Sequence, residues 1–217
     1  MKTIRMIPLA LVLILVPAVA HGQGFSIGGR AGTAGIGPEV ALGLSDAAVI
    51  RAGIGLLPFD YTDEIEGREY TLTLPASFAT VSLDFYPGGG PVRIMGGVLF
   101  RSGNVEVESP VRAGEEVGGY IATADGTVFG ELEQSTVAPF AGIGFGKHTE
   151  GGFGLFLDLG VAMAGEGDVV ISASGPYAND PNVTAALADI RQEIDDNAAD
   201  YLKFWPIVSL GVKVPLG

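Results

Sequence analysis

Histidine is the side chain most often used for acid–base catalysis near neutral pH, and the sequence contains two histidines. His21 lies near the start of the chain, and His148 stands beside Lys147 and Glu150 in a stretch typical of a short turn. No serine lies near His148 in the sequence to act as a nucleophile. The sequence therefore predicts no catalytic residue and makes His148 a solvated turn residue.

The sequence also contains no motif that would bind a cofactor. The chain has no cysteine, which excludes disulfides, thiolate catalysis and cysteine-bound metals. The glycine-rich run from Gly142 to Gly146 lacks the G-x-G-x-x-G spacing and the following helix that a phosphate cradle needs. No bound cofactor is predicted.

Two stretches are rich in carboxylates and could bind divalent cations or repel other negative surfaces. They contain Asp60, Asp63, Glu64, Glu66 and Glu69, and then Glu106, Glu108, Glu115, Glu116 and Asp125. Neither stretch has the ligand spacing of a calcium loop. We interpret both as solvated loop charge and predict no metal site.

The first 22 residues have the three-part layout of a secretory signal peptide. Lys2 and Arg5 precede an apolar run over residues 7–16, and Ala18-Val19-Ala20 forms a small-x-small cleavage pattern. Cleavage is expected after Ala20 or Gly22, which leaves residues 23–217 as one domain. This segment holds two cations and no acid, so its loss changes the formal net charge from −13 to −15. A chain with this negative charge is not expected to bind nucleic acid, because the phosphate backbone is negative as well.

Beyond that segment the dominant pattern is an alternation of apolar and small or polar residues, which is the signature of β-strands. Between Phe153 and Met163, every second residue is apolar and the intervening face carries Asp158. Eight such segments occur, over residues 25–32, 36–44, 50–56, 70–86, 92–101, 137–145, 153–163 and 205–214. The fourth changes phase, and we expect a β-bulge near Pro75 to restore one face.

The connections between these segments alternate in length. Short turns are expected at 45–46, 87–91 and 147–152, and longer segments at roughly 60–69, 102–127 and 165–203. Residues 33–35 form a short link where a long one is expected. Alternating short turns and long loops are typical of outer-membrane barrels. The predicted fold class is all-β, an eight-stranded antiparallel up-and-down transmembrane barrel with one helix in the last long loop.

The placement of charge separates a membrane barrel from a soluble one. The mostly apolar faces of the eight segments carry no charged residue. The opposite faces carry Arg30, Glu39, Arg51, Asp84, Arg93, Arg101, Asp158 and Lys213. A water-facing sheet surface would carry more than one charge per strand, whereas isolated ions among small residues suit a narrow, filled lumen. We predict that these eight residues form a buried ion network.

Aromatic residues cluster near both sets of segment ends, as expected for two interfacial girdles. One predicted girdle holds Phe25, Phe85, Tyr86, Phe145 and Phe153, and the other holds Phe59, Tyr61, Tyr70, Phe100 and Phe204.

The signal segment, the eight alternating strands, the Phe85-Tyr86-Pro87 turn and the strand over residues 138–146 resemble small outer-membrane barrels of the OmpA/OmpX/OmpW type. The resemblance implies an outer-membrane location and contact with lipid and lipopolysaccharide. It also implies insertion by the barrel-assembly machinery and a monomeric state. Such barrels usually end in an aromatic residue, whereas this sequence ends Val214-Pro215-Leu216-Gly217.

Residues 183–203 have the apolar spacing of a helix, with Val183, Leu187 and Ile190 on one face. Asp180 or Asn182 is the expected N-cap. We expect this helix to cap the barrel or to lie at its rim, and a partner-binding role is the alternative.

Three functions remain open. The first is a structural or interaction barrel of the cell envelope with a lumen filled by side chains and no catalysis. The second is a narrow, porin-like channel for small or apolar solutes, which a lumen free of ion pairs would favour. The third is a lipid-modifying enzyme, for which His148 is the only candidate base.

Overall fold

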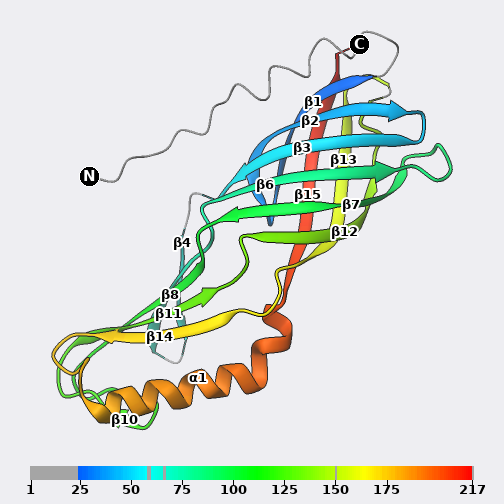
Figure 1. Ribbon diagram of the computed structural model, residues 1–217. Coiled ribbons are helices and arrows are strands. Elements are labelled where there is room, and N and C mark those ends of the chain that lie inside the picture. Colours follow the sequence, from blue (N-terminus) through cyan, green and yellow to red (C-terminus); the bar gives the residue numbers. More distant parts are fainter. Residues whose placement is uncertain (1–23, 58–59, 66, 150, 217) are drawn as a thin grey trace, which may run out of the picture.

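The computed structural model describes residues 24–216 apart from 58–59, 66 and 150. The predicted signal peptide and its cleavage site therefore lie outside the described residues. Within the described part, eight strands close into an antiparallel barrel in the order β1-β15-β13-β12-β7-β6-β3-β2 (Figure 1). Pairing of β1 with β15 closes the barrel. The strands are β1 (Phe25–Gly32), β2 (Gly35–Ser45), β3 (Ala48–Leu56), β6 (Ser77–Phe85), β7 (Val92–Ser102), β12 (Val137–Phe145), β13 (Gly154–Met163) and β15 (Phe204–Pro215).

The side chains of the barrel point the opposite way from those of a soluble protein. On β13, Leu155, Leu159 and Met163 are exposed, whereas Phe156 and Asp158 are buried. The same alternation runs along the other barrel strands, whose exposed residues are mostly Val, Ile, Leu and Phe. An exposed apolar band over buried ions is stable only where the outer surface meets lipid. The predicted fold class is thus confirmed, with its apolar face turned outward.

The three long connections extend the structure beyond one end of the barrel (Figure 1). They form a five-stranded sheet in the order β14-β11-β8-β5-β4 and a small hairpin of β9 and β10. The strands are β4 (Asp60–Ile65), β5 (Arg68–Thr73), β8 (Val105–Val111), β9 (Glu116–Val117), β10 (Tyr120–Ile121), β11 (Gly126–Glu133) and β14 (Asp168–Ser174). We call this sheet, the hairpin and the helix described below the platform. The barrel end next to it is the platform end, and the end with the links 46–47, 86–91 and 146–153 is the turn end.

Two expectations about this region were wrong. The segments predicted as loops contain strands, and the phase change near Pro75 is not a bulge, because β6 pairs with β3 and β7 without a shift in register. The change of phase marks the point where the chain leaves the platform sheet at Thr73 and enters the barrel at Ser77. Pro75, which has no N–H to donate, lies buried between the two sheets.

The helix α1 (Pro181–Leu202) forms where expected, and Asp180 is its N-cap, because the Asp180 carboxylate accepts a hydrogen bond from the backbone N–H of Asn182 at 2.8 Å. It does not cap the barrel. Val183 and Leu187 pack against Val111, Val117 and Tyr177 in a second hydrophobic core, which belongs to the platform. Figure 1 shows the helix alongside β14. No helix in the described part of the chain has the length and apolar character needed to cross a membrane.

The predicted girdles are only partly present. At the turn end, Phe85, Phe145 and Phe153 are exposed, but Tyr86 is 3% exposed and points inward. At the platform end, Phe100 and Phe204 are exposed on barrel strands. Tyr61 and Tyr70 belong instead to the platform strands β4 and β5, because those strands are a separate sheet. Phe59 lies outside the described residues.

Candidate functional site

Glycines on the lumen face make room for long side chains that cross the barrel. A Cβ at Gly144 would lie 2.5 Å from Cζ of Arg93, and one at Gly53 would lie 3.2 Å from Cζ of Arg30. The guanidinium groups therefore occupy space that any larger residue would take. This close approach explains why the lumen face combines glycine with arginine.

Arg51 and Arg93 share two carboxylates inside the barrel. Arg51 contacts Asp84 at 2.7 Å through Nε and Asp158 at 2.9 Å through Nη1. Arg93 contacts Asp84 at 2.8 Å, also pairs with Asp158, and donates to the backbone oxygen of Gly146 at 2.6 Å. Both arginines and both aspartates are at most 4% exposed. Burial of four charges is costly, and only such mutual pairing compensates for it.

Glu39 connects this group to a third arginine. Its carboxylate lies 3.2 Å from Nη1 of Arg51 and 3.6 Å from Nη1 of Arg30. Six of the eight predicted residues thus form one continuous network: Arg30, Glu39, Arg51, Asp84, Arg93 and Asp158.

The other two predicted residues are buried elsewhere in the lumen. Arg101 is 7% exposed and donates through Nε to the backbone oxygen of Ser135 at 3.1 Å, near the platform end. Lys213 is 4% exposed, and its side chain crosses β13 at Gly154, near the turn end. The prediction of one network of eight residues therefore does not hold for Arg101, because its partner is a backbone oxygen rather than a carboxylate.

His148 belongs to the network, and the expectation of a solvated turn residue was wrong. It is 1% exposed, because the turn folds back over the lumen, and its ring packs 4.6 Å from that of Phe156. Its Nε2 lies 3.3 Å from a Glu39 carboxylate oxygen, and its Nδ1 lies 3.2 Å from the Tyr86 hydroxyl. A neutral ring that donates from Nε2 and accepts at Nδ1 satisfies both contacts. Burial lowers the pKa of His148, which favours this neutral form.

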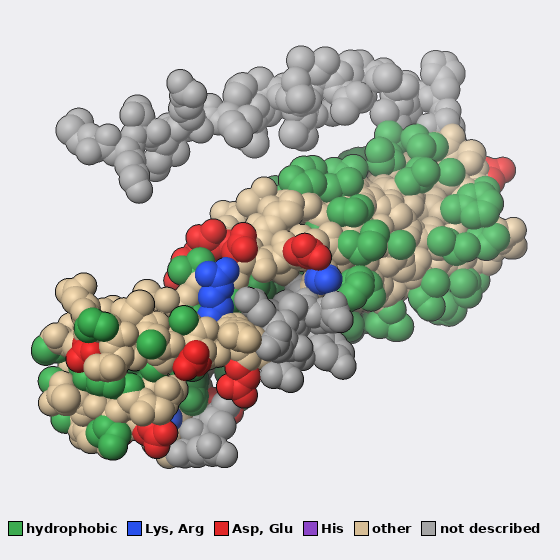
Figure 2. Space-filling model, turned by 60° about the horizontal axis from the view of Figure 1, so that its bottom comes forward, with side chains coloured by type: hydrophobic (Ala, Val, Ile, Leu, Met, Phe, Trp, Pro, Cys, Tyr) green, Lys and Arg blue, Asp and Glu red, His purple; other side chains and the backbone are tan. Residues whose placement is uncertain are grey.

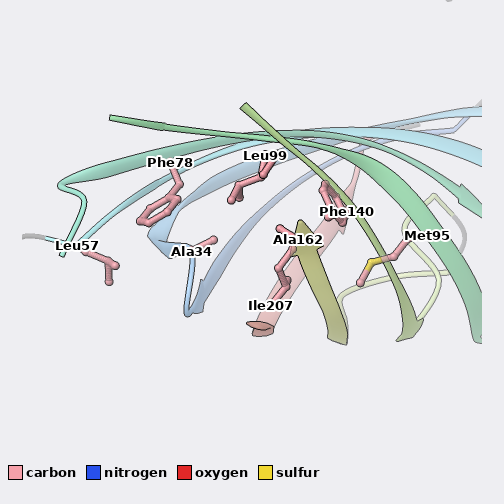
Figure 3. Packing of buried hydrophobic residues seen from close by; sticks show 9 residues of the cluster. Ala34, Leu57, Phe78, Met95, Leu99, Phe140, Ala162 and Ile207 are labelled. Atoms are coloured by element: carbon pink, nitrogen blue, oxygen red, sulfur yellow. The ribbon is translucent and has the colours of Figure 1, made fainter. Parts of the chain in front are cut away.

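An apolar plug fills the lumen toward the platform end. Phe78, Leu99, Phe140 and Ile207 are each at most 7% exposed and point into the barrel together (Figure 3). Trp205 packs against this plug, with its ring 5.4 Å from that of Phe78. A cavity of about 20 Å³ remains between the plug and the ion network, and that volume holds roughly one water-sized particle.

The arrangement offers little for bond-breaking chemistry. Among the described residues, no group of three or more His, Asp or Glu side chains is placed to hold a metal ion. The carboxylates of the network are engaged by arginines, and His148 is closed off from solvent. The acidic residues predicted as loop charge lie in part on platform strands, as Glu106 and Glu108 do on β8.

Comparison with known proteins agrees with the fold. No family model matches the chain, and no curated protein matches it in sequence. Among solved structures, it is similar to CarO2 of Acinetobacter baumannii, with 17% identity, a TM-score of 0.65, and coverage of 90% of this chain and 100% of that one. It is also similar to CarO of Acinetobacter baumannii, with 17% identity, a TM-score of 0.64, and coverage of 87% and 96%.

CarO is an outer-membrane protein. The chain thus has the fold of a small outer-membrane β-barrel, and its exposed apolar band is the surface expected of a barrel embedded in lipid. The finer likeness to the OmpA, OmpX and OmpW barrels stays a prediction.

Proposed function

We propose that this protein is a closed outer-membrane barrel that anchors the platform outside the cell, with a structural or interaction role in the envelope. The observation that carries the proposal is a contrast within the molecule. The barrel lumen is filled by the apolar plug and by the ion network, whereas the three long connections form an ordered sheet with its own core. Long connections of outer-membrane barrels usually face the exterior, which supports an external position of the platform.

The filled lumen argues against the channel alternative. A permeating solute would have to displace both the apolar plug and a network of six paired ions. Separating a buried ion pair costs several kcal/mol, and here the ions are paired more than once. The remaining cavity of about 20 Å³ does not form a path.

The two edges of the platform sheet favour contact with a partner at one of them. The β4 edge carries Asp60, Asp63 and Glu64, and charges on an edge strand discourage pairing with another strand. The β14 edge has its only acidic residue, Asp168, at its start and continues uncharged to Ser174. Next to it, Ala173, Leu187 and Ala188 line a groove of about 370 Å³. An extended segment that adds to the sheet would find both backbone partners and a recess here.

The enzyme alternative receives no support from the position of His148. Its ring is buried at the turn end, in contact with Tyr86 and Glu39, and no serine hydroxyl is placed against it by any described hydrogen bond. We therefore assign no catalytic role, no cofactor and no metal. Outer-membrane lipid and lipopolysaccharide are the proposed neighbours of the apolar band, and the barrel-assembly machinery is its proposed insertase.

Conductance in a planar lipid bilayer tests the closed barrel. We expect no single-channel steps from purified protein, with a known open porin as the positive control. Stable steps from this protein would contradict the proposal and favour the channel.

A second measurement tests the platform. The three long connections are replaced by two-residue turns with the sequence of the link at Thr33 and Ala34. We expect this variant to reach the outer membrane and to resist detergent unless heated. It should nevertheless fail to restore the envelope phenotype of a strain from which the gene has been deleted. If the platform-free variant restores that phenotype fully, the platform is not the functional part.

A further inference from the structure

A groove runs along the edge of β14, which is the last strand of the platform sheet as the structure describes it. The four consecutive residues from Val170 to Ala173 line this groove, together with Leu187 and Ala188 of α1. Consecutive residues of a strand point to opposite faces of the sheet. Four in a row can therefore line one groove only if the groove follows the edge of the strand, with α1 as its wall.

The side of the groove next to α1 is mostly apolar. Ile171 and Ala173 face the helix and pack beside Leu187 against the platform core. Ala188 extends this wall with a small side chain, and Arg191 also belongs to it. A strand added at the β14 edge would turn every second side chain toward the wall. Small apolar side chains fit that position.

The outer face of the sheet, which points away from α1, is acidic next to the same edge. Asp168 of β14 pairs directly with Glu133 of β11, and Glu131 of β11 pairs directly with Glu106 of β8. Asp168 and Glu133 are exposed, and neither makes an ion pair within the described part of the chain. Like charges that lie directly opposite each other destabilise a sheet. A cation on an added strand, next to Asp168, would offset this repulsion.

A second copy of the chain does not supply such a cation. The platform sheet offers two edge strands for pairing between copies, β4 and β14. Neither strand contains lysine or arginine, and together they hold four acids, Asp60, Asp63, Glu64 and Asp168. Pairing between copies would therefore leave the acidic face without compensation.

We propose that the β14 edge binds an extended segment of another protein, in which small apolar residues alternate with lysine or arginine. The apolar residues lie against α1, and the cations lie on the outer face with one of them next to Asp168. Residues 57–76, 103–136 and 164–203 together contain twenty acids and four cations, so the platform also attracts a basic partner at long range. This inference rests on the proposed function, because it requires the platform to be a contact surface.

A synthetic strand peptide provides the direct test. The fluorescent peptide Lys-Val-Thr-Val-Lys-Val-Thr-Val-Lys is titrated with the full-length protein in a neutral detergent, and its anisotropy should rise to saturation. A peptide with glutamate in place of lysine should bind roughly tenfold more weakly, because its charge has the wrong sign. A peptide with proline in place of threonine should lose a similar factor, because proline interrupts a strand ladder.

A change on the helix wall tests the groove itself. Ala188→Phe fills the groove from an exposed position of α1 and should weaken binding of the lysine peptide roughly tenfold. The matched control is Ala185→Phe, at an exposed position of the same helix that does not line the groove. The control should bind the peptide as the wild type does.

A change of charge tests the outer face. Asp168→Asn should weaken binding of the lysine peptide about two- to fivefold, which is the range of a cross-strand charge pair. Asp60→Asn is the matched control, because Asp60 is an exposed acid at the start of the other edge strand, β4. Both variants change only exposed side chains, so this comparison decides alone if Ala188→Phe does not fold.

Several results would overturn the proposal. They are equal binding of the lysine and glutamate peptides, unchanged binding in folded Ala188→Phe, and no saturable binding to the wild type. A dimer of the wild type that Ala188→Phe dissociates would also overturn it, by assigning the groove to a second copy.

The deletion strain separates this inference from the proposed function. Ala188→Phe should fail to restore the envelope phenotype, as the platform-free variant does. If Ala188→Phe restores the phenotype and the platform-free variant does not, the groove is not the contact surface, although the platform is. If the platform-free variant restores the phenotype, the proposed function itself fails.

Discussion

At the scale of residues, the lumen is built from pairs in which a glycine admits a long side chain from the neighbouring strand. Arg93 shows the pattern most clearly, because it is fully buried, is held by Asp84 and Asp158, and lies against Gly144. A side chain held on several sides cannot move away from an added atom. Lumen glycines should therefore be far less tolerant of substitution than glycines facing lipid.

Gly144→Ala should destabilise the barrel by about 1–3 kcal/mol, because the new Cβ would lie 2.5 Å from Arg93 Cζ. Urea unfolding in lipid vesicles measures this free energy. Gly96→Ala is the control, since its Cβ on the outer face of β7 would meet only a backbone oxygen at 3.8 Å. Equal stability of the two variants would show that Arg93 is not confined as described.

The stability of the barrel should fall in mild acid because of His148. Burial holds the pKa of His148 below its usual value near 6.5, so the folded ring stays neutral while the unfolded chain takes up a proton. Its contribution is therefore complete above about pH 6.5 and is lost as pH falls below that value, at up to about 1.4 kcal/mol per pH unit.

The measurement is the free energy of unfolding of wild type and His148→Gln across this range. Gln can keep a hydrogen bond to Tyr86 but does not titrate. The variant should show a shallower loss of stability below about pH 6.5. Identical pH profiles would mean that His148 is not buried in the neutral form.

At the scale of elements, the barrel strands were predictable and the platform strands were not. Each barrel strand has lipid on one side and a narrow lumen on the other, so apolar residues alternate with small or charged ones along its whole length. Most platform strands are shorter than the barrel strands, and β4, β8 and β11 carry two or three acidic residues each, a composition typical of loops. A signal was present in β8, where Val105 and Val107 alternate with Glu106 and Glu108.

The candidate site was predictable in part for a similar reason. Strand parity alone places Arg30, Glu39 and Asp158 on the lumen face. Parity does not determine how a turn folds, so His148 was missed. The inward-facing Tyr86, at the start of another turn, was likewise assigned to a girdle because of its place at the end of a predicted strand.

Leu187→Ala should loosen the platform without affecting the barrel. Leu187 is 8% exposed in the platform core, and removing a buried leucine side chain costs about 2–5 kcal/mol. Limited proteolysis should cleave the platform of this variant faster, while the barrel still resists detergent unless heated. Leu159→Ala, on the lipid-facing side of β13, is the control for a leucine outside that core. Joint loss of barrel and platform would show that the two cores unfold as one unit.

At the scale of the whole molecule, the surface divides into two kinds. Hydrophobic side chains cover the barrel, and charged ones gather mostly over the platform (Figure 2). The barrel band includes Ile54, Leu83, Ile143 and Leu210, each more than half exposed. Such a continuous apolar surface is stable only in lipid, so its tolerance of charge should depend on depth in the membrane.

Arginine substitutions along β13 test this dependence. Leu159 lies near the middle of the strand and Met163 at its platform end, and both face outward, 42% and 53% exposed. In lipid vesicles, Leu159→Arg should cost about 2–4 kcal/mol and Met163→Arg about 0–1 kcal/mol, because only the first places a charge near the bilayer midplane. Urea unfolding of the two variants against wild type gives both values. A soluble barrel with the same exposed residues would tolerate both arginines equally, so equal and small costs would remove the membrane assignment.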